Sequence, residues 1–278
     1  MQGLWRRLVT AVIFVVIMAA GHYTGPYTFA LLFLVIAAGC LWEFFGLTLD
    51  LHTRRDRIRK VFGVILGLMP FGLVAALKLM DITDPENFIS LAALLFSPMV
   101  FTIFIYELYS HSREPFANIA YMILGLFYIG IPFALVNFIA FDGTDFRNRI
   151  VFGLLVLTWV NDTGAYVSGS LVGKTPLFPR ISPKKTWEGS VGGLITTLLF
   201  GWALSFIFDE IPLVQWLGLA VIVGIFGGLG DLVESMLKRS VGVKDSGDLL
   251  PGHGGLLDRF DAFIFLIPFA AAYLLYLR

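Results

Sequence analysis

The sequence predicts an all-α, polytopic integral membrane protein with about nine transmembrane helices. Hydrophobic residues make up 58% of the 278 residues and charged residues only 14%, and the mean hydropathy is +0.83. Soluble domains are about 45–50% apolar and about 25% charged. Twenty Lys and Arg balance twenty Asp and Glu, so a soluble protein of this composition would be expected to precipitate. These numbers exclude a soluble enzyme, a basic nucleic-acid-binding protein and a disordered chain.

Long apolar runs dominate the sequence, and a helix crosses a bilayer in about 20 residues. Turn-forming pairs such as Gly25-Pro26 and Asp84-Pro85 separate the runs. Arg6 and Arg7 before the first run are also typical of a cleaved signal peptide, but the many later spans favour a membrane helix. The predicted spans are Leu8–Tyr23, Tyr27–Leu49, Val61–Met80, Phe88–Tyr109, Ala117–Phe141, Ile150–Leu171, Val191–Phe208, Leu213–Gly230 and Phe260–Leu277.

The basic residues predict the orientation, because cytosolic loops of membrane proteins are enriched in Lys and Arg. With the N-terminus in the cytosol, 16 of the 20 Lys and Arg residues fall on the cytosolic side. The opposite turns carry acids, among them Asp84, Asp142 and Asp209. We therefore expect a cytosolic N-terminus and an outside C-terminus, in a cytoplasmic (inner) membrane of the bacterial type.

Two predicted cytosolic segments, Val172–Ser190 and Asp231–Arg259, are longer and more polar than the other loops. The sequence thus predicts an N-terminal region of about five transmembrane helices, residues 1–149. It predicts a C-terminal catalytic region of about four helices, residues 150–278, with a cytosolic motif at 231–261. The single cysteine, Cys40, lies in an apolar run, so the chain has no disulfide framework.

Carboxylates, cations and glycines alternate between residues 231 and 261. Asp231 ends one predicted span, and Asp258 and Asp261 begin the next, which lets the three converge on a hard cation. Magnesium prefers a few carboxylates together with substrate phosphates. A solvated loop with surface ion pairs explains the same composition, and the residues alone leave both interpretations open.

The other polar segment places Lys184 and Lys185 directly before a predicted helix start, where Thr186 or Ser190 is a candidate cap. A helix N-terminus beside cations is a ready phosphate site. Any cytosolic loop carries lysines, however, so membrane topology is the competing explanation.

Asn161 and Asp162 follow eleven residues of the sixth predicted span, a rise of about 16 Å that reaches the middle of the bilayer. An ionisable residue there is costly and functional by default. Asp162, Tyr166, Gly169 and Gly173 share one helix face. We expect this face to line a cavity that reaches the site; close helix packing through the glycines is the alternative.

The residues from Ser235 to Asp261 resemble the signature of the phosphatidate cytidylyltransferases, the CDP-diacylglycerol synthases. The matching stretches are Ser235-x-Leu237-Lys238-Arg239, Lys244-Asp245-x-Gly247, Leu250-Pro251-x-His253-Gly254-Gly255-Leu256 and Asp258-Arg259-Phe260-Asp261. Gly230-Asp231-Leu232-x-Glu234-Ser235, the segment 182–189 and the segment 161–166 are also similar to that family. The resemblance covers the C-terminal half, and the first 150 residues share only the number of spans and Trp42-Glu43.

The resemblance implies that phosphatidic acid and CTP are converted to CDP-diacylglycerol and pyrophosphate with Mg²⁺. It implies CTP, phosphatidic acid and the lipid bilayer as partners, no nucleic acid, and a homodimer. A phosphate monoester is largely a dianion at pH 7, so the attacking phosphate needs no strong base. The reaction needs charge neutralisation instead, from cations and one or two metal ions.

Each motif residue then receives an expected role. Asp231 and Asp258 are the expected metal ligands, and Asp261 either binds metal or orients Arg259 or a metal-bound water. We expect His253 to contact the nucleotide or shape the glycine-rich turn, because an ionised phosphate needs no general base. The expected catalytic residues are Asp231, Asp258, Lys238, Arg239, Lys244 and Arg259. The residues expected to bind substrate or phosphate are Lys184, Lys185, Thr186, His253, Gly254, Asn161, Asp162 and Tyr166.

Two other functions remain open. A transporter would use Asp162, Glu43 and Glu107, all within predicted spans, as an ion path, although the internal repeats common in transporters are not evident. A related enzyme would transfer CMP from CTP to another lipid phosphate. A membrane scaffold would not need so polar a segment.

Overall fold

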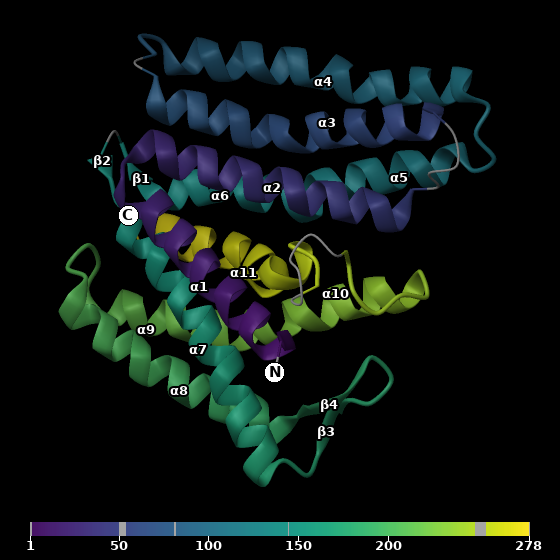
Figure 1. Cartoon of the computed structure of the whole chain (residues 1–278). Helices are drawn as coiled ribbons and strands as arrows, with labels where there is room; N and C mark the ends of the chain where they lie inside the picture. Colours follow the sequence, from purple (N-terminus) through teal and green to yellow (C-terminus); the bar gives the residue numbers. More distant parts are fainter. Residues whose placement is uncertain (1, 50–53, 81, 144, 248–253, 278) are drawn as a thin grey trace. The chain divides into compact units, whose positions relative to one another are not determined.

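A computed structural model describes residues 2–49, 54–80, 82–143, 145–247 and 254–277, with the side chains of residues 2–11, 54 and 55 left aside. This part of the chain is helical apart from two short antiparallel β-hairpins (Figure 1). Eight of its helices are long and apolar enough to cross a membrane. The predicted class, an all-α polytopic membrane protein, is therefore confirmed. The first predicted span falls on α1 (Gln2–Tyr23), whose described apolar stretch is only Val12–Tyr23, so the count of nine spans stays a prediction.

The chain divides into two compact units. The first unit comprises Met1–Asn137 and Ser246–Leu257, and the second comprises Phe138–Asp245 and Asp258–Arg278. The cytosolic motif predicted at 231–261 is thus divided: residues 231–245 and 258–261 belong to the second unit, and residues 246–257 belong to the first. The prediction that residues 150–278 form the catalytic region, and residues 1–149 a separate N-terminal region, stays a prediction.

The first unit is built around α2, which packs against α1, α3 and α5. Phe29, Phe33, Phe44 and Phe45 on α2 are fully buried and form much of its core. Proline, which suits the first turn of a helix, opens several of these helices. The helices of this unit are α1, α2 (Pro26–Thr48), α3 (Arg54–Leu79), α4 (Pro85–Ser110), α5 (Pro115–Gly125), the π-helix η1 (Leu126–Gly130) and most of α6 (Ile131–Ala140).

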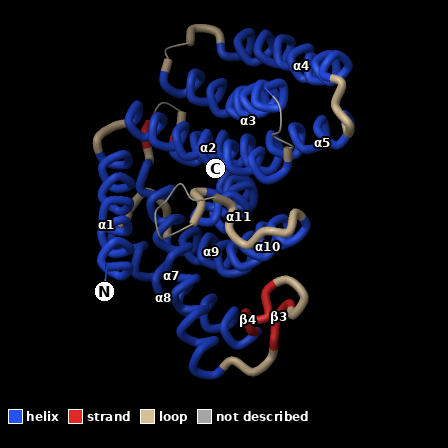
Figure 2. Tube along the Cα trace, turned by 45° about the vertical axis from the view of Figure 1, so that its right-hand side comes forward, coloured by secondary structure: helices blue, strands red, loops and turns tan. Residues whose placement is uncertain are grey.

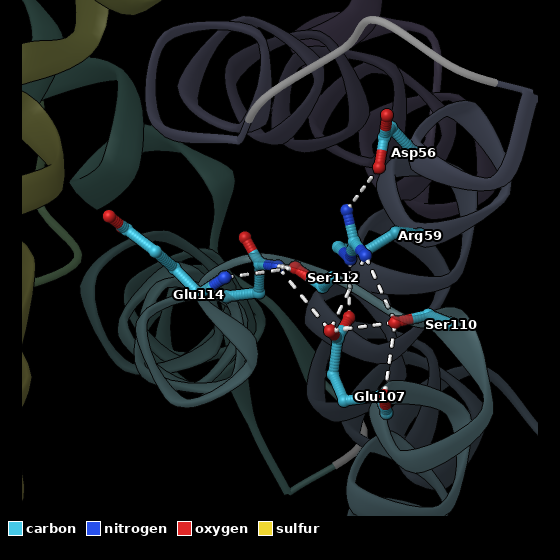
Figure 3. A network of polar contacts seen from close by, with 7 residues as sticks. Asp56, Arg59, Glu107, Ser110, Ser112 and Glu114 are labelled. Carbon is cyan, nitrogen blue, oxygen red and sulfur yellow. Dashed lines mark hydrogen bonds and ion pairs between the residues drawn. The ribbon is translucent and has the colours of Figure 1, made fainter.

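A buried polar network joins α3, α4 and α5 within the first unit (Figure 3). The Arg59 guanidinium forms an ion pair with Glu107 and a second, 2.6 Å long, with Asp56. Glu107 also accepts hydrogen bonds from Ser110 and Asn118, at 3.1 and 3.3 Å. Arg59 and Glu107 are 1% and 3% exposed, so each charge is buried together with its partners.

In the second unit α7 and α8 pack along each other, and α8 also packs against α9. The hairpin of β3 and β4 lies between the end of α7 and the start of α8 in the chain and projects to one side of these helices (Figure 2). The elements are β1 (Phe141–Asp142), β2 (Asp145–Phe146), α7 (Asn148–Val172), β3 (Pro176–Phe178), β4 (Ser182–Thr186), α8 (Trp187–Ile207), α9 (Leu213–Ile222), the π-helix η2 (Val223–Gly227), α10 (Gly228–Ser240) and α11 (Leu257–Tyr276).

The eighth predicted span ends too early. The span was expected to stop at Gly230, but α9, η2 and α10 run consecutively from Leu213 to Ser240. Hydropathy falls after Gly230, whereas helix formation continues because charged side chains four residues apart, such as Glu234 and Lys238, support a polar helix. The first ten residues of the motif therefore lie on a helix and not in a loop.

Candidate active site

Lys238 on α10 joins two motif carboxylates. Its Nζ lies 2.6 Å from Glu234 Oε2 on the same helix and 2.6 Å from Asp258 Oδ1 at the start of α11. The Lys238 and Asp258 side chains are each 11% exposed and that of Glu234 is 1% exposed. A largely buried lysine with two acidic partners ties α10 to α11 within the second unit.

Lys185 at the end of β4 reaches the same helix. Its Nζ lies 2.6 Å from Asp231 Oδ2 and donates to the carbonyl oxygen of Gly228 at 3.2 Å. The Ser235 hydroxyl donates to Asp231 Oδ1 at 3.3 Å. Residues from the two polar segments predicted from the sequence are thus in direct contact.

Two further carboxylates lie within electrostatic range of this contact. Asp261 is 9% exposed and interacts with Asp231, Asp162 and Lys185, while the backbone N–H of Ala262 donates to its Oδ1 at 2.7 Å. Asp162 on α7 interacts with Asp231, Lys185 and Arg259. The structure thus brings the mid-span aspartate together with the motif.

These contacts define one group of side chains, which we call the acidic cluster. It contains five carboxylates and three cations, a formal excess of two negative charges. The members of the acidic cluster are Asp162, Lys185, Asp231, Glu234, Lys238, Asp258, Arg259 and Asp261.

The charge of the acidic cluster suits a divalent cation. Its donors are carboxylate oxygens, the ligands that Mg²⁺ prefers, and the buried Glu234 Oε1 finds no hydrogen-bond partner within the described part of the chain. Among the described residues no three His, Cys, Asp or Glu side chains are grouped closely enough to hold a metal by themselves. Magnesium usually binds through one or two carboxylates plus substrate phosphates, so it does not need such a cage. The donor chemistry therefore fits a magnesium ion that arrives with its substrate.

The β3–β4 hairpin is fixed to α8 by two side chains at the start of that helix. Thr186 caps α8, as predicted, by accepting the N–H of Gly189 at 3.1 Å. Glu188 accepts from the backbone N–H groups of Lys174 and Thr175 at 3.1 Å and from the Thr175 hydroxyl at 2.8 Å. These bonds set the position of β4 and hence of Lys185.

The glycines of α7 serve helix packing. A Cβ at Gly169 or Gly173 would lie 3.2 or 2.7 Å from Thr186 Oγ1, so both positions sit against the start of α8. Asn161 is buried and accepts from the Thr197 hydroxyl on α8 at 3.3 Å. On the predicted face only Asp162 interacts with the acidic cluster, and Tyr166 is 76% exposed.

Several predicted site residues are not among the members of the acidic cluster. Exposed Arg239 donates to the Val243 carbonyl at 3.0 Å, and Lys184 and Lys244 are exposed. Gly254 has a φ of 81°, a left-handed conformation that glycine tolerates without cost. His253 falls outside the described residues, so its predicted role stays a prediction.

Two acidic residues have roles that the sequence did not assign. Glu234 belongs to the motif as the partner of Lys238, and its place in the Gly230–Ser235 stretch was a usable signal. Glu43 on α2 accepts hydrogen bonds from Ser246, Leu256 and Leu257 within the first unit. Its only sequence signal was the weak Trp42-Glu43 resemblance.

Comparison with known proteins assigns the chain to a family. A model of the cytidylyltransferase family matches residues 5–277. A phosphatidate cytidylyltransferase of Staphylococcus saprophyticus is 42% identical over 205 residues, which are 71% of this chain and 76% of that protein. The proteins of that name from Staphylococcus haemolyticus and Staphylococcus aureus are 43% and 40% identical, with the same shares of both chains covered. The chain therefore belongs to the cytidylyltransferase family.

Proposed function

We propose that this chain is a phosphatidate cytidylyltransferase that makes CDP-diacylglycerol and pyrophosphate from phosphatidic acid and CTP. The observation that carries the proposal is the acidic cluster, in which residues of both family-like segments meet. Its place in an apolar, polytopic chain suits a lipid substrate whose acyl chains stay in the bilayer. Relatives at 40–43% identity carry that enzyme's name.

In the proposed reaction an ionised phosphate oxygen of phosphatidate attacks the α-phosphorus of CTP. A new P–O bond forms in line with the bond to the β-phosphate, which breaks to release pyrophosphate. Lys185 and Lys238 hold Asp231 and Asp258 in fixed positions before substrate arrives. Arg259, exposed at the start of α11, is proposed to bind the triphosphate and the leaving pyrophosphate.

The proposed cofactor is Mg²⁺, held by Asp231 and Asp258 with Asp261 near them. When bound, it supplies positive charge that offsets the repulsion between two phosphate groups. The negative excess of the acidic cluster supports this assignment, because the protein cations alone leave the site repulsive to phosphate. Lys185 and Lys238 orient the carboxylates that would receive the ion.

The proposed setting is a cytoplasmic membrane of the bacterial type with the acidic cluster facing the cytosol. The excess of Lys and Arg in the predicted cytosolic loops supports this orientation. CTP then reaches the site from the cytosol while phosphatidate enters from the bilayer. A homodimer remains part of the proposal.

The transporter alternative loses support from two of its three carboxylates. Glu107 is paired with Arg59, and Glu43 is hydrogen-bonded to backbone N–H groups. Both have structural partners that account for a buried charge in a membrane helix.

The deciding experiment measures transfer of the cytidylyl group to lipid. Purified protein in detergent is incubated with CTP labelled in the cytidine, phosphatidate and Mg²⁺, and the lipid phase is counted. We expect label in CDP-diacylglycerol, and none when phosphatidate is omitted. A polyprenyl phosphate in place of phosphatidate tests the related enzyme. Label that never enters the lipid phase with phosphatidate contradicts the proposal.

A further inference from the structure

Glu43 holds the backbone at the end of the family motif. It lies on α2, five residues before the helix ends at Thr48, and is 6% exposed. Its Oε1 accepts the N–H of Leu256 at 2.9 Å, and its Oε2 accepts the N–H of Leu257 at 2.8 Å. The Ser246 hydroxyl donates to Oε2 at 3.2 Å. One carboxylate thus binds both ends of the first unit's second segment, Ser246–Leu257.

Two motif glycines let the backbone come this close. A Cβ at Gly247 would lie 2.7 Å from Glu43 Oε1. A Cβ at Gly255 would lie 2.5 Å from Oε2 and 2.0 Å from Ser246 Oγ. A side chain at either position would push the carboxylate away from its donors. The hydrogen bonds of Glu43 therefore depend on both glycines, although more than 200 residues separate Glu43 from them in the chain.

The negative charge of Glu43 is compensated on the side of α3. Lys60 is 7% exposed, interacts electrostatically with Glu43, and places its Nζ 4.1 Å from the centre of the Trp42 ring. The carboxylate also accepts the N–H of Leu257, the first residue of α11, and the first turn of a helix carries partial positive charge and unsatisfied donors. A full negative charge fits this position better than a neutral amide does.

The residue bonded to Glu43 directly precedes two members of the acidic cluster. Helix α11 begins at Leu257, whose N–H is bound to Glu43, and Asp258 and Arg259 are the next two residues. Fixing the first turn of a helix fixes the direction in which its next side chains leave the backbone. We propose that Glu43 is a positioning residue that orients Asp258 and Arg259 for catalysis. This inference rests on the function proposed above.

The test replaces Glu43 by Gln, which keeps the size of the side chain. The amide nitrogen of Gln cannot accept a hydrogen bond, so at most one of the two N–H groups keeps its acceptor. We expect kcat to fall about 10- to 100-fold, because small misplacement of a catalytic group costs that much. The loss should appear in kcat more than in the KM for CTP, because the orientation of Asp258 and Arg259 matters most in the transition state.

Glu107→Gln is the matched control. It alters another buried carboxylate of the first unit, the partner of Arg59, and does not touch the motif. We expect it to lower thermal stability at least as much as Glu43→Gln while leaving kcat near the wild-type value. Equal kcat losses in the two variants, in proportion to their losses of stability, would overturn the proposal.

A second measurement needs no substrate and so separates this inference from the proposed function. Hydrogen exchange at the Leu256 and Leu257 amides should accelerate in Glu43→Gln and stay slow in Glu107→Gln. Unchanged exchange in Glu43→Gln would overturn the anchoring role even if the wild type is active. If the wild type is inactive but exchange is faster in Glu43→Gln, the proposed function is contradicted, whereas the bonding of the Leu256 and Leu257 amides to Glu43 is supported.

Gly247→Ala tests the same contact from the other side and guards against misfolding of Glu43→Gln. Its methyl group would displace the Glu43 carboxylate, so we expect a similar fall in kcat. Because both changes disrupt one contact, the double variant should lose less than the product of the two single effects. A normal kcat in Gly247→Ala, or fully multiplicative losses, would count against the proposal.

Discussion

Asp258 is the residue on which the acidic cluster depends most directly, since it alone joins α11 to Lys238 by an ion pair among the described contacts. Asp258→Asn keeps its shape and leaves Lys238 paired with Glu234. We expect kcat to fall about 100- to 1000-fold, the usual cost of removing a group that stabilises transition-state charge. The labelled-CTP assay measures it.

The control for that change is Asp209→Asn, which neutralises a carboxylate whose side chain is 92% exposed and pairs only with an exposed arginine. It should retain wild-type kcat. If Asp258→Asn also retains it, Asp258 neither binds metal nor orients the site.

Glu234 should affect metal affinity more than turnover. It is buried, bonds the lysine that orients Asp258, and contributes to the negative excess of the acidic cluster. Glu234→Gln removes the carboxylate that holds Lys238 beside the expected metal ligand Asp258, and such supporting groups typically change metal affinity about 10- to 100-fold. The Mg²⁺ concentration for half-maximal activity should therefore rise about tenfold, with kcat recovered at saturating Mg²⁺. An unchanged magnesium titration would remove Glu234 from this role.

The residues that the sequence could place are those whose partners lie in the same motif. Asp231, Lys238 and Asp258 were identified because a run of chemically specific residues resembled one family, and the structure brings them into one cluster. The role of Glu43 could not be predicted from the sequence, because its hydrogen-bond donors are backbone N–H groups 213 and 214 residues away. Every residue except proline has such a donor, so no sequence pattern reports it.

The helices α7 and α8 meet through small residues, and this contact sets the distance between Asp162 and the hairpin. A Cβ at Gly193 on α8 would lie 2.8 Å from Asn161 Oδ1 and 3.0 Å from the Asn161 carbonyl oxygen. Overpacking of this kind costs about 1–3 kcal/mol. Gly193→Ala should lower thermal stability in detergent accordingly.

Gly72→Ala on α3 is the comparison, because a Cβ there meets nothing within 4 Å. Alanine favours a helix over glycine by up to about 1 kcal/mol, so this variant should be as stable as the wild type or more so. Equal destabilisation of both variants would show that the α7–α8 contact is not tight.

Helix boundaries were predicted best where the apolar run and the helix end at the same residue. In α10 the two ends differ, because charged residues begin at Asp231 but the helix continues to Ser240. The β3–β4 hairpin lacks the apolar alternation of a half-buried strand, and it depends on Glu188 bonding to Lys174 and Thr175. Such tertiary bonds are invisible to a local pattern.

At the scale of the whole molecule, zero net charge conceals an uneven distribution along the chain. The predicted cytosolic loops hold 16 of the 20 Lys and Arg residues, whereas arginines in the predicted outer turns pair with acids, as in Arg147–Asp142 and Arg149–Asp209. This distribution leaves basic charge near the motif segments. It also makes the orientation of the chain a testable physical claim.

The chain is suited to a labelling test of that orientation, because its only cysteine, Cys40, is buried in α2. Single cysteines replace exposed Asp209, in a predicted outer turn, and exposed Arg180, between β3 and β4 in a predicted cytosolic loop. In intact spheroplasts a membrane-impermeant maleimide should label Asp209→Cys at once and Arg180→Cys only after permeabilisation, while the wild type stays unlabelled. The reverse pattern would place the acidic cluster on the outer face, away from cytosolic CTP, and would contradict the orientation and the nucleotide supply together.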